Sequence, residues 1–111
     1  MSDATLESRI RAALAGRPVR EVRMFGGLSF LVDGTIFVAA RAGGDLLVRI
    51  DPRHRDEFLG LPGVSAAVMA GGRTMGRQWI TVDAASLTSD AELREWLDVA
   101  LDDAGARRPG D

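Results

Sequence analysis

The sequence predicts an α+β fold of two layers, in which an antiparallel sheet of five to six strands has helices packed on one face. Two observations lead to this prediction. Four short apolar runs follow one another between residues 19 and 51, with only a few residues between them. One amphipathic helical pattern precedes these runs and two more follow, in the order α-β4-α-β1/2-α. Connections this short join antiparallel neighbours, so the runs should form a meander covered by the helices.

The first helix should span residues 3–15. Its apolar residues recur at helical spacing and form one stripe, consisting of Leu6, Ile10, Ala13 and Leu14. Ser2 or Asp3 is expected to cap its start, and Gly16 is expected to end it. A single apolar stripe suits a helix that lies on a sheet.

Four strands should follow Pro18. We expect them at Val19–Phe25, Leu28–Asp33, Thr35–Arg41 and Leu46–Asp51. The pair Gly26-Gly27 separates the first two strands, and glycine there tolerates positive φ or the close approach of a neighbouring strand or ligand. Asp33-Gly34 is a strong signal for a tight turn between the second and third strands.

The second half of the chain should contain a short helix and one or two strands. Asp51 is expected to cap a helix that has Pro52 at its first position and ends near Leu59. The expected strands are Val64–Met69 and Gln78–Val82, with a glycine-rich connection between them.

The closing helix has the clearest pattern in the chain. Ser89 and Glu92 have the spacing of a capping box. An apolar stripe follows, consisting of Leu93, Trp96, Leu97, Ala100, Leu101 and Ala104. Gly105 is expected to end the helix. We therefore predict one domain over residues 1–105 and a flexible tail over 106–111.

Composition narrows the classes of function. The chain of 111 residues has no cysteine, which excludes disulfides, thiolate catalysis and cysteine-ligated zinc. No apolar run approaches the roughly 20 residues of a membrane helix, and no secretory leader pattern is present, so a cytoplasmic protein is expected. The net charge of −2 gives no overall attraction to nucleic acid or an anionic membrane. All 14 basic residues are arginine, which we attribute to composition bias in preference to phosphate or carboxylate recognition.

No residue pattern indicates a catalytic centre, a metal site or a cofactor site. His54 is the one histidine, and it stands among scattered charges at a helix start, as expected of a solvated helix face. Gly26-Gly27 runs from strand to strand, whereas phosphate-binding loops run from a strand into a helix.

Two short groups of arginine and aromatic residues could contact nucleic acid. The first contains Arg17, Arg20, Arg23 and Phe25, and the second contains Arg73, Arg77 and Trp79. Exposed strand ends with solvating arginines would look the same, so we do not expect direct nucleic-acid binding.

Both faces of the central strands are apolar. Leu28 and Phe30 alternate with Leu31 in one strand, and Val38 alternates with Phe37 in the next. The face without helices must then be covered by the chain itself, by a second copy or by another protein. We accordingly expect a homodimer or a protein partner.

Three segments resemble the N-terminal domain of the TfoX/Sxy family. These are Arg23-Met24-Phe25-Gly26-Gly27 with Asp33-Gly34, then Asp45–Asp51, then Met75-Gly76 with Trp79 and Val82. The resemblance implies a small α+β domain of bacterial competence regulators, which act as coactivators alongside the cyclic-AMP receptor protein. It implies no catalytic residues. The chain departs from the family at residues 63–67, where the usual Pro-Phe-aromatic run is absent.

These observations favour a non-enzymatic, stand-alone interaction domain that regulates transcription through a protein partner. The residues expected to form its interaction site are Arg23, Met24, Phe25, Gly26, Gly27, Met75, Gly76 and Trp79. The alternative is a ligand-binding or enzymatic pocket near the Gly26-Gly27 and Met75–Trp79 segments.

Overall fold

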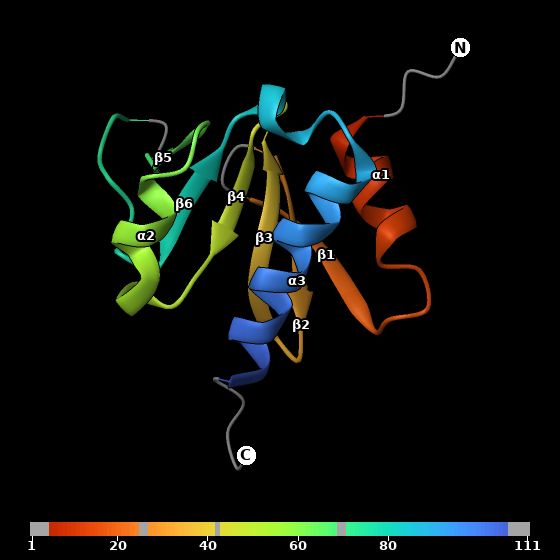
Figure 1. Ribbon diagram of the computed structural model, residues 1–111. Coiled ribbons are helices and arrows are strands. Elements are labelled where there is room, and N and C mark those ends of the chain that lie inside the picture. Colours follow the sequence, from red (N-terminus) through yellow and green to blue (C-terminus); the bar gives the residue numbers. More distant parts are fainter. Residues whose placement is uncertain (1–4, 25–26, 42, 69–70, 107–111) are drawn as a thin grey trace.

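The computed structural model describes residues 5–24, 27–41, 43–68 and 71–106. They form one open antiparallel sheet of six strands with α-helices packed against it (Figure 1). The strands are β1 (Val19–Met24), β2 (Gly27–Val32), β3 (Thr35–Arg41), β4 (Leu46–Arg49), β5 (Val64–Ala66) and β6 (Trp79–Val82). The α-helices are α1 (Leu6–Ala13), α2 (Arg55–Leu59) and α3 (Asp90–Ala106), and the short 3₁₀ helices are η1 (Pro52–His54) and η2 (Ala84–Leu87). The predicted fold class is confirmed.

The first four strands form the predicted meander, and the last two extend it in reverse order. The sheet runs β1-β2-β3-β4-β6-β5, so β6 lies between β4 and β5. Asp33 and Gly34 connect β2 to β3 with φ values of 51° and 79°, as a tight hairpin turn requires. A bulge between Phe30 and Leu31 shifts the register of β2 against β3.

The start of α1 differs from the prediction. Thr5 caps this helix, and its side-chain oxygen accepts a hydrogen bond of 3.1 Å from the Ser8 amide. The predicted caps, Ser2 and Asp3, lie outside the described residues. The prediction failed because every residue from Ser2 to Thr5 except Ala4 is a good cap, so the sequence alone does not choose among them.

The other helix starts are confirmed. Asp51 accepts a hydrogen bond of 2.9 Å from the Arg53 amide at the start of η1, with Pro52 at the first position. The Ser89 amide donates to the Glu92 carboxylate at 3.2 Å, and the Glu92 amide donates to the Ser89 hydroxyl at 3.1 Å. These reciprocal bonds are the predicted capping box.

Several predicted ends differ from the structure. The first helix ends at Ala13, β2 ends at Val32 and β4 ends at Arg49, each one or two residues earlier than predicted. The last helix continues through Gly105 to Ala106, because one glycine near a helix end costs only about 1 kcal/mol relative to alanine. β5 ends at Ala66, three residues earlier than predicted. The chain leaves the sheet there, and the Arg41 guanidinium donates a hydrogen bond of 2.7 Å to the Val68 carbonyl oxygen.

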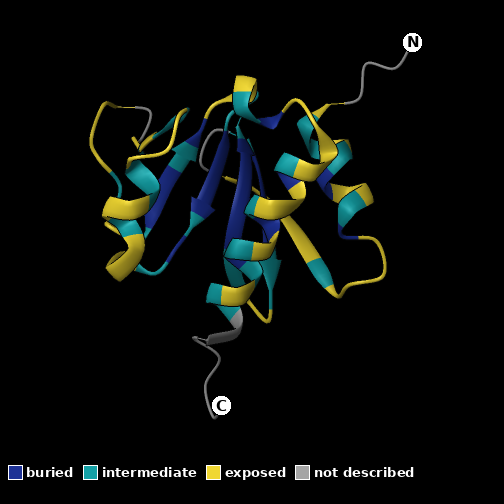
Figure 2. Ribbon diagram, viewed as in Figure 1, coloured by how far each residue is buried: buried dark blue, intermediate teal, exposed yellow. Residues whose placement is uncertain are grey.

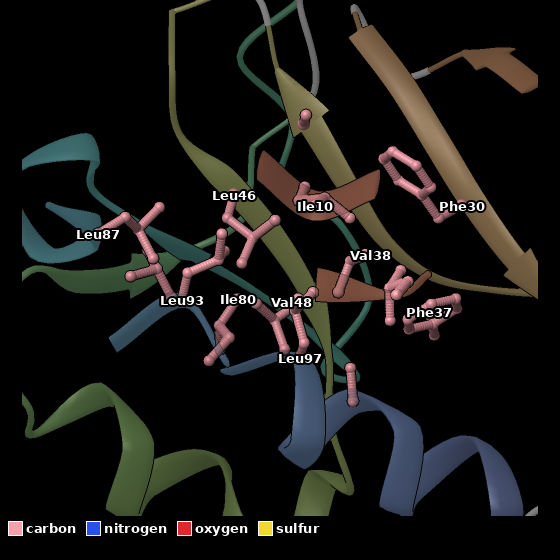
Figure 3. Close-up of a cluster of buried hydrophobic side chains, with 14 of the residues drawn as sticks. Ile10, Phe30, Phe37, Val38, Leu46, Val48, Ile80, Leu87, Leu93 and Leu97 are labelled. Atoms are coloured by element: carbon pink, nitrogen blue, oxygen red, sulfur yellow. The ribbon is translucent and has the colours of Figure 1, made fainter. Parts of the chain in front are cut away.

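The main core lies between the helices and one face of the sheet, which we call the helix-covered face. Figure 3 shows part of this cluster, with side chains from both layers. The helices contribute Ile10 and Leu14 from the α1 region and Leu93, Leu97 and Ala100 from α3. The sheet contributes Leu28, Phe30, Phe37, Val38, Ala40, Leu46, Val48, Ile80 and Val82.

A smaller cluster occupies the middle of the opposite face, which we call the second face. It consists of buried Ala39, Leu47, Ala67 and Trp79, with Ile36 and Met75 packed against them. Ala67 and Met75 belong to the connection between β5 and β6, so the chain itself covers this part of the sheet. The expectation of a partner therefore applies only to the parts of the second face beyond this cluster.

Candidate functional site

The described part of the Arg-Met-Phe-Gly-Gly motif lies at one end of the β1–β2 hairpin. Arg23 and Met24 end β1, and Gly27 begins β2 as the partner of Met24; Phe25 and Gly26 lie outside the described residues. Met24 is 43% exposed. Its side chain points to the second face, because alternate residues of β1 face opposite sides.

Gly27 is required by the packing of two backbones. A Cβ at this position would overlap the carbonyl oxygen of Ala40 on β3. The close approach predicted for the glycine pair is therefore an approach of strand to strand at Gly27. This glycine has a structural role that needs no ligand.

Arg23 and its neighbour on the same side of β1 pair with α1. The Arg23 guanidinium lies 3.1 Å from the Glu7 carboxylate. The Arg11 guanidinium holds Glu21 by two hydrogen bonds of 2.9 and 2.8 Å. This hydrogen-bonded contact lowers the pKa of Glu21. The two pairs attach α1 to the edge strand and keep charged groups on the helix-covered side of β1.

The other half of the predicted site contains a buried tryptophan. Trp79 is only 7% exposed and packs with Met75 in the second-face cluster. The guanidinium carbon of Arg49 lies 5.9 Å from the centre of the Trp79 ring. The Gly76 carbonyl oxygen accepts a hydrogen bond of 3.1 Å from the Trp79 amide, in the turn that leads into β6.

Gly27 and Trp79, one from each half of the predicted site, lie toward opposite ends of the sheet. The Leu28, Ala40, Leu46 and Val82 positions form one row across the strands. Gly27 lies one residue beyond this row at one end, whereas Trp79 lies three residues from it toward the other end. Gly27 and Trp79 are therefore not neighbours.

Described residues line several open grooves. One of about 380 Å³ includes Glu7, Ala40 and Arg41 in its lining and lies beside Gly27, which pairs with Arg41.

Another open groove, of about 300 Å³, runs between η1, α2 and the end of α3, and its lining includes His54, Phe58 and Asp102. The imidazole of His54 is exposed and meets the edge of the Phe58 ring at a centroid distance of 6.5 Å. At the edge of the groove, hydrogen bonding to Arg53 lowers the pKa of Asp51 to about 2. Among the described residues, no group of three His, Cys, Asp or Glu side chains is arranged to hold a metal ion.

Of the two arginine and aromatic groups, the second does not expose the ring on which a base would stack, and Phe25 of the first lies outside the described residues. In the second group, Arg73 and Arg77 are exposed but the Trp79 ring is buried. In the first group, Arg23 is paired with Glu7. Base stacking needs an exposed ring beside the cations.

A family model of the TfoX N-terminal domain matches residues 12–104. The chain belongs to the TfoX N-terminal domain family. A comparison with curated proteins gave no match. The match confirms the resemblance seen in the motifs and covers the whole sheet and all but the last two residues of α3. None of the helices in the described ranges is long and apolar enough to cross a membrane.

Sequence reasoning missed the contacts that fix the ends of the sheet. The Arg11–Glu21 pair, the Arg23–Glu7 pair and the Arg41–Val68 hydrogen bond join residues 10, 16 and 27 positions apart. Their spacing carries no periodic signal, so only the folded structure identifies them. The exposure of Met24 likewise depends on the folded sheet, in which β1 is an edge strand.

Proposed function

We propose that this TfoX N-terminal domain is a non-enzymatic, cytoplasmic interaction domain that regulates transcription by contacting another regulatory protein. The observation that carries the proposal is the position of the family's most specific motif. Its described residues lie on the surface at the end of an edge strand, and Met24 exposes an apolar side chain there. A flexible thioether on an exposed surface suits contact with a protein.

The chemistry of the motif also supports a binding role. Its described side chains are a guanidinium paired with a carboxylate, a thioether and a glycine whose place is fixed by backbone packing. None of these is a nucleophile or a general base at neutral pH. The family's link to competence regulators suggests that the partner acts in transcription.

The test uses a strain of the source organism that lacks the gene. Transcript levels are compared after complementation with the wild type, with Met24→Glu and with Leu61→Glu. Leu61 is the matched control, because it is an apolar residue of similar exposure, 44% against 43%, outside the motif. We expect the wild type and Leu61→Glu to restore the transcripts and Met24→Glu to fail, at equal protein levels.

The opposite result would contradict the proposal. If deletion leaves every transcript unchanged, the domain has no regulatory role. If Met24→Glu restores transcription as well as the wild type does, the motif is not the contact surface.

A further inference from the structure

β1 is an edge strand with an exposed surface along almost its whole length. It is the first strand of the sheet, next to β2 alone among the described strands. Every residue of β1 after Val19 is exposed (Figure 2). An edge of this kind can pair with another strand through its backbone groups.

The register of the hairpin shows which backbone groups of β1 are available. Met24 pairs with Gly27 across only two residues, so these two form the hydrogen-bonded pair that closes the hairpin. Alternation then directs the amide and carbonyl groups of Val22 toward β2 and those of Glu21 and Arg23 away from it. The Val19 amide fits this alternation, because it donates to the Arg17 carbonyl oxygen at 2.9 Å and not to β2.

We infer that β1 pairs antiparallel with β1 of a second copy, about a two-fold axis at Val22. In this register, Glu21 of each copy lies opposite Arg23 of the other, and their outward backbone groups form the hydrogen-bonded pairs. Each charged side chain therefore meets the opposite charge. The two copies would form one continuous sheet.

The charges of β1 disfavour the neighbouring registers. A two-fold axis at Arg20 or at Arg23 places two guanidinium groups opposite each other. An axis at Glu21 places two carboxylates opposite each other. Like charges directly opposite in a sheet are destabilising, so the strand is self-complementary in one of these four registers.

The second face gains apolar contacts in the same register. The two Val22 side chains, each 43% exposed in the single chain, meet at a non-hydrogen-bonded position, where their Cα atoms are about 4.5 Å apart. Arg20 lies opposite Met24 of the other copy, and its aliphatic stem can pack on the thioether. The side chain of Met24 stays on the second face, beside the edge that the dimer uses.

The dimer does not rest on the proposed role in transcription, and one variant separates the two. Met24→Glu places a carboxylate opposite Arg20 of the other copy, which favours the pairing. We therefore expect Met24→Glu to remain dimeric even though it is expected to fail in the transcription test.

The first experiment uses a single introduced cysteine. The chain has no cysteine of its own, so Val22→Cys gives each copy one thiol. The Cα separation at the axis is within the range of a disulfide. Mild oxidation should convert most of Val22→Cys to a linked dimer, whereas Leu61→Cys, a control of similar exposure, should stay monomeric. No preference of Val22→Cys over the control would overturn the inference.

The second experiment tests the charges by sedimentation velocity. Glu21→Arg alone places two guanidinium groups opposite each other at two symmetric positions, and Arg23→Glu alone does the same with carboxylates. Each should raise the dimer dissociation constant by about tenfold or more. An equimolar mixture of the two variants restores opposite charges and should dimerise as the wild type does.

Circular dichroism checks that both variants fold, as expected because the exposed ion pairs that they lose contribute little to stability. A wild type that sediments as a monomer at all concentrations would overturn the inference. So would single variants that dimerise as well as the wild type.

Discussion

The two faces of the sheet are stabilised in different ways. The helix-covered face has a core that reaches from Leu28 on β2 to Val82 on β6 and includes large side chains from two helices. The second face has a cluster of four buried residues, of which Trp79 alone is large and aromatic. It is covered by a connection and by no helix of the described residues. Tight packing of backbones and small residues replaces a second core there.

The comparison shows why the second face is apolar without being wholly exposed. Ala39 and Leu47 are both 0% exposed, yet their cover consists of Ala67, Met75 and Trp79 from the β5–β6 region. Toward β1 this cover ends, and Val22 and Met24 become exposed. The unpartnered surface is therefore at the edge of the sheet and not at its centre.

The largest difference in stability between the two faces should appear when a core side chain is truncated to alanine. Phe30→Ala on the helix-covered face should lower the free energy of unfolding by about 3–5 kcal/mol, because it leaves a cavity among helix and strand side chains. Leu47→Ala on the second face should cost less, about 2–3 kcal/mol, because Ala67 and Met75 lie on a connection and can move inward. Urea denaturation measures both values.

A cost of Leu47→Ala as large as that of Phe30→Ala would break this comparison. It would show that the β5–β6 connection is as rigid a cover as the helices. Unchanged slopes of the urea transitions would confirm that the two variants share the same unfolded state.

A smaller effect is expected where backbone packing replaces side chains on the second face. Gly27→Ala should cost about 1–3 kcal/mol, because its methyl group overlaps the Ala40 carbonyl oxygen and the strands must move apart. Gly43→Ala is the matched control, since a Cβ there meets no described atom within 4 Å. It should leave stability unchanged or raise it slightly through the unfolded state. Thermal melting of the two variants, measured side by side, decides whether the close approach of the strands restricts position 27 to glycine.

The smallest effect concerns acid and should be confined to the helix-covered side. Arg53 lowers the pKa of Asp51 to about 2 from an ordinary value of 3.8. Because the folded pKa lies below the unfolded one, the contribution of Asp51 is complete above about pH 4 and is lost as the pH falls from 3.8 toward 2. Asp51→Asn keeps the cap and should remove this part of the pH dependence.

The chain has two tryptophans, one on each side of the sheet, so fluorescence can show which face responds to acid first. Trp96 on α3 meets Phe58 at a centroid distance of 5.5 Å, whereas Trp79 lies in the second-face cluster. In acid, fluorescence of a Trp79→Phe variant should change before that of a Trp96→Phe variant. Simultaneous changes in both would show that the two faces open together.

Local chemistry explains which parts of the fold could be predicted from the sequence. The Asp33-Gly34 turn and the Ser89–Glu92 capping box each depend on residues close together in the chain, and both were predicted correctly. The first helix cap was not, because Ser2, Asp3 and Thr5 are all suitable. The position of β6 between β4 and β5 depends on pairing between residues far apart, such as Leu46 and Val82.

The prediction of the site also succeeded where it depended on neighbouring residues and failed where it depended on long-range pairing. A glycine pair between strands indicated a close backbone approach, and Gly27 shows one with Ala40. Nothing local distinguishes exposed Met24 from buried Trp79, because both follow a strand pattern. Their difference arises from position in the sheet, since β1 lies at an edge and β6 lies inside.

The β5 edge of the sheet limits how many copies of the chain can add to it. β5 has three residues, half the length of β1, and it is the last strand of the order. In the dimer inferred above, both β1 edges would be paired, and a third copy that arrived at the β5 edge would find too few backbone groups to hold it. A sheet built this way closes as a finite particle and does not propagate into a fibre.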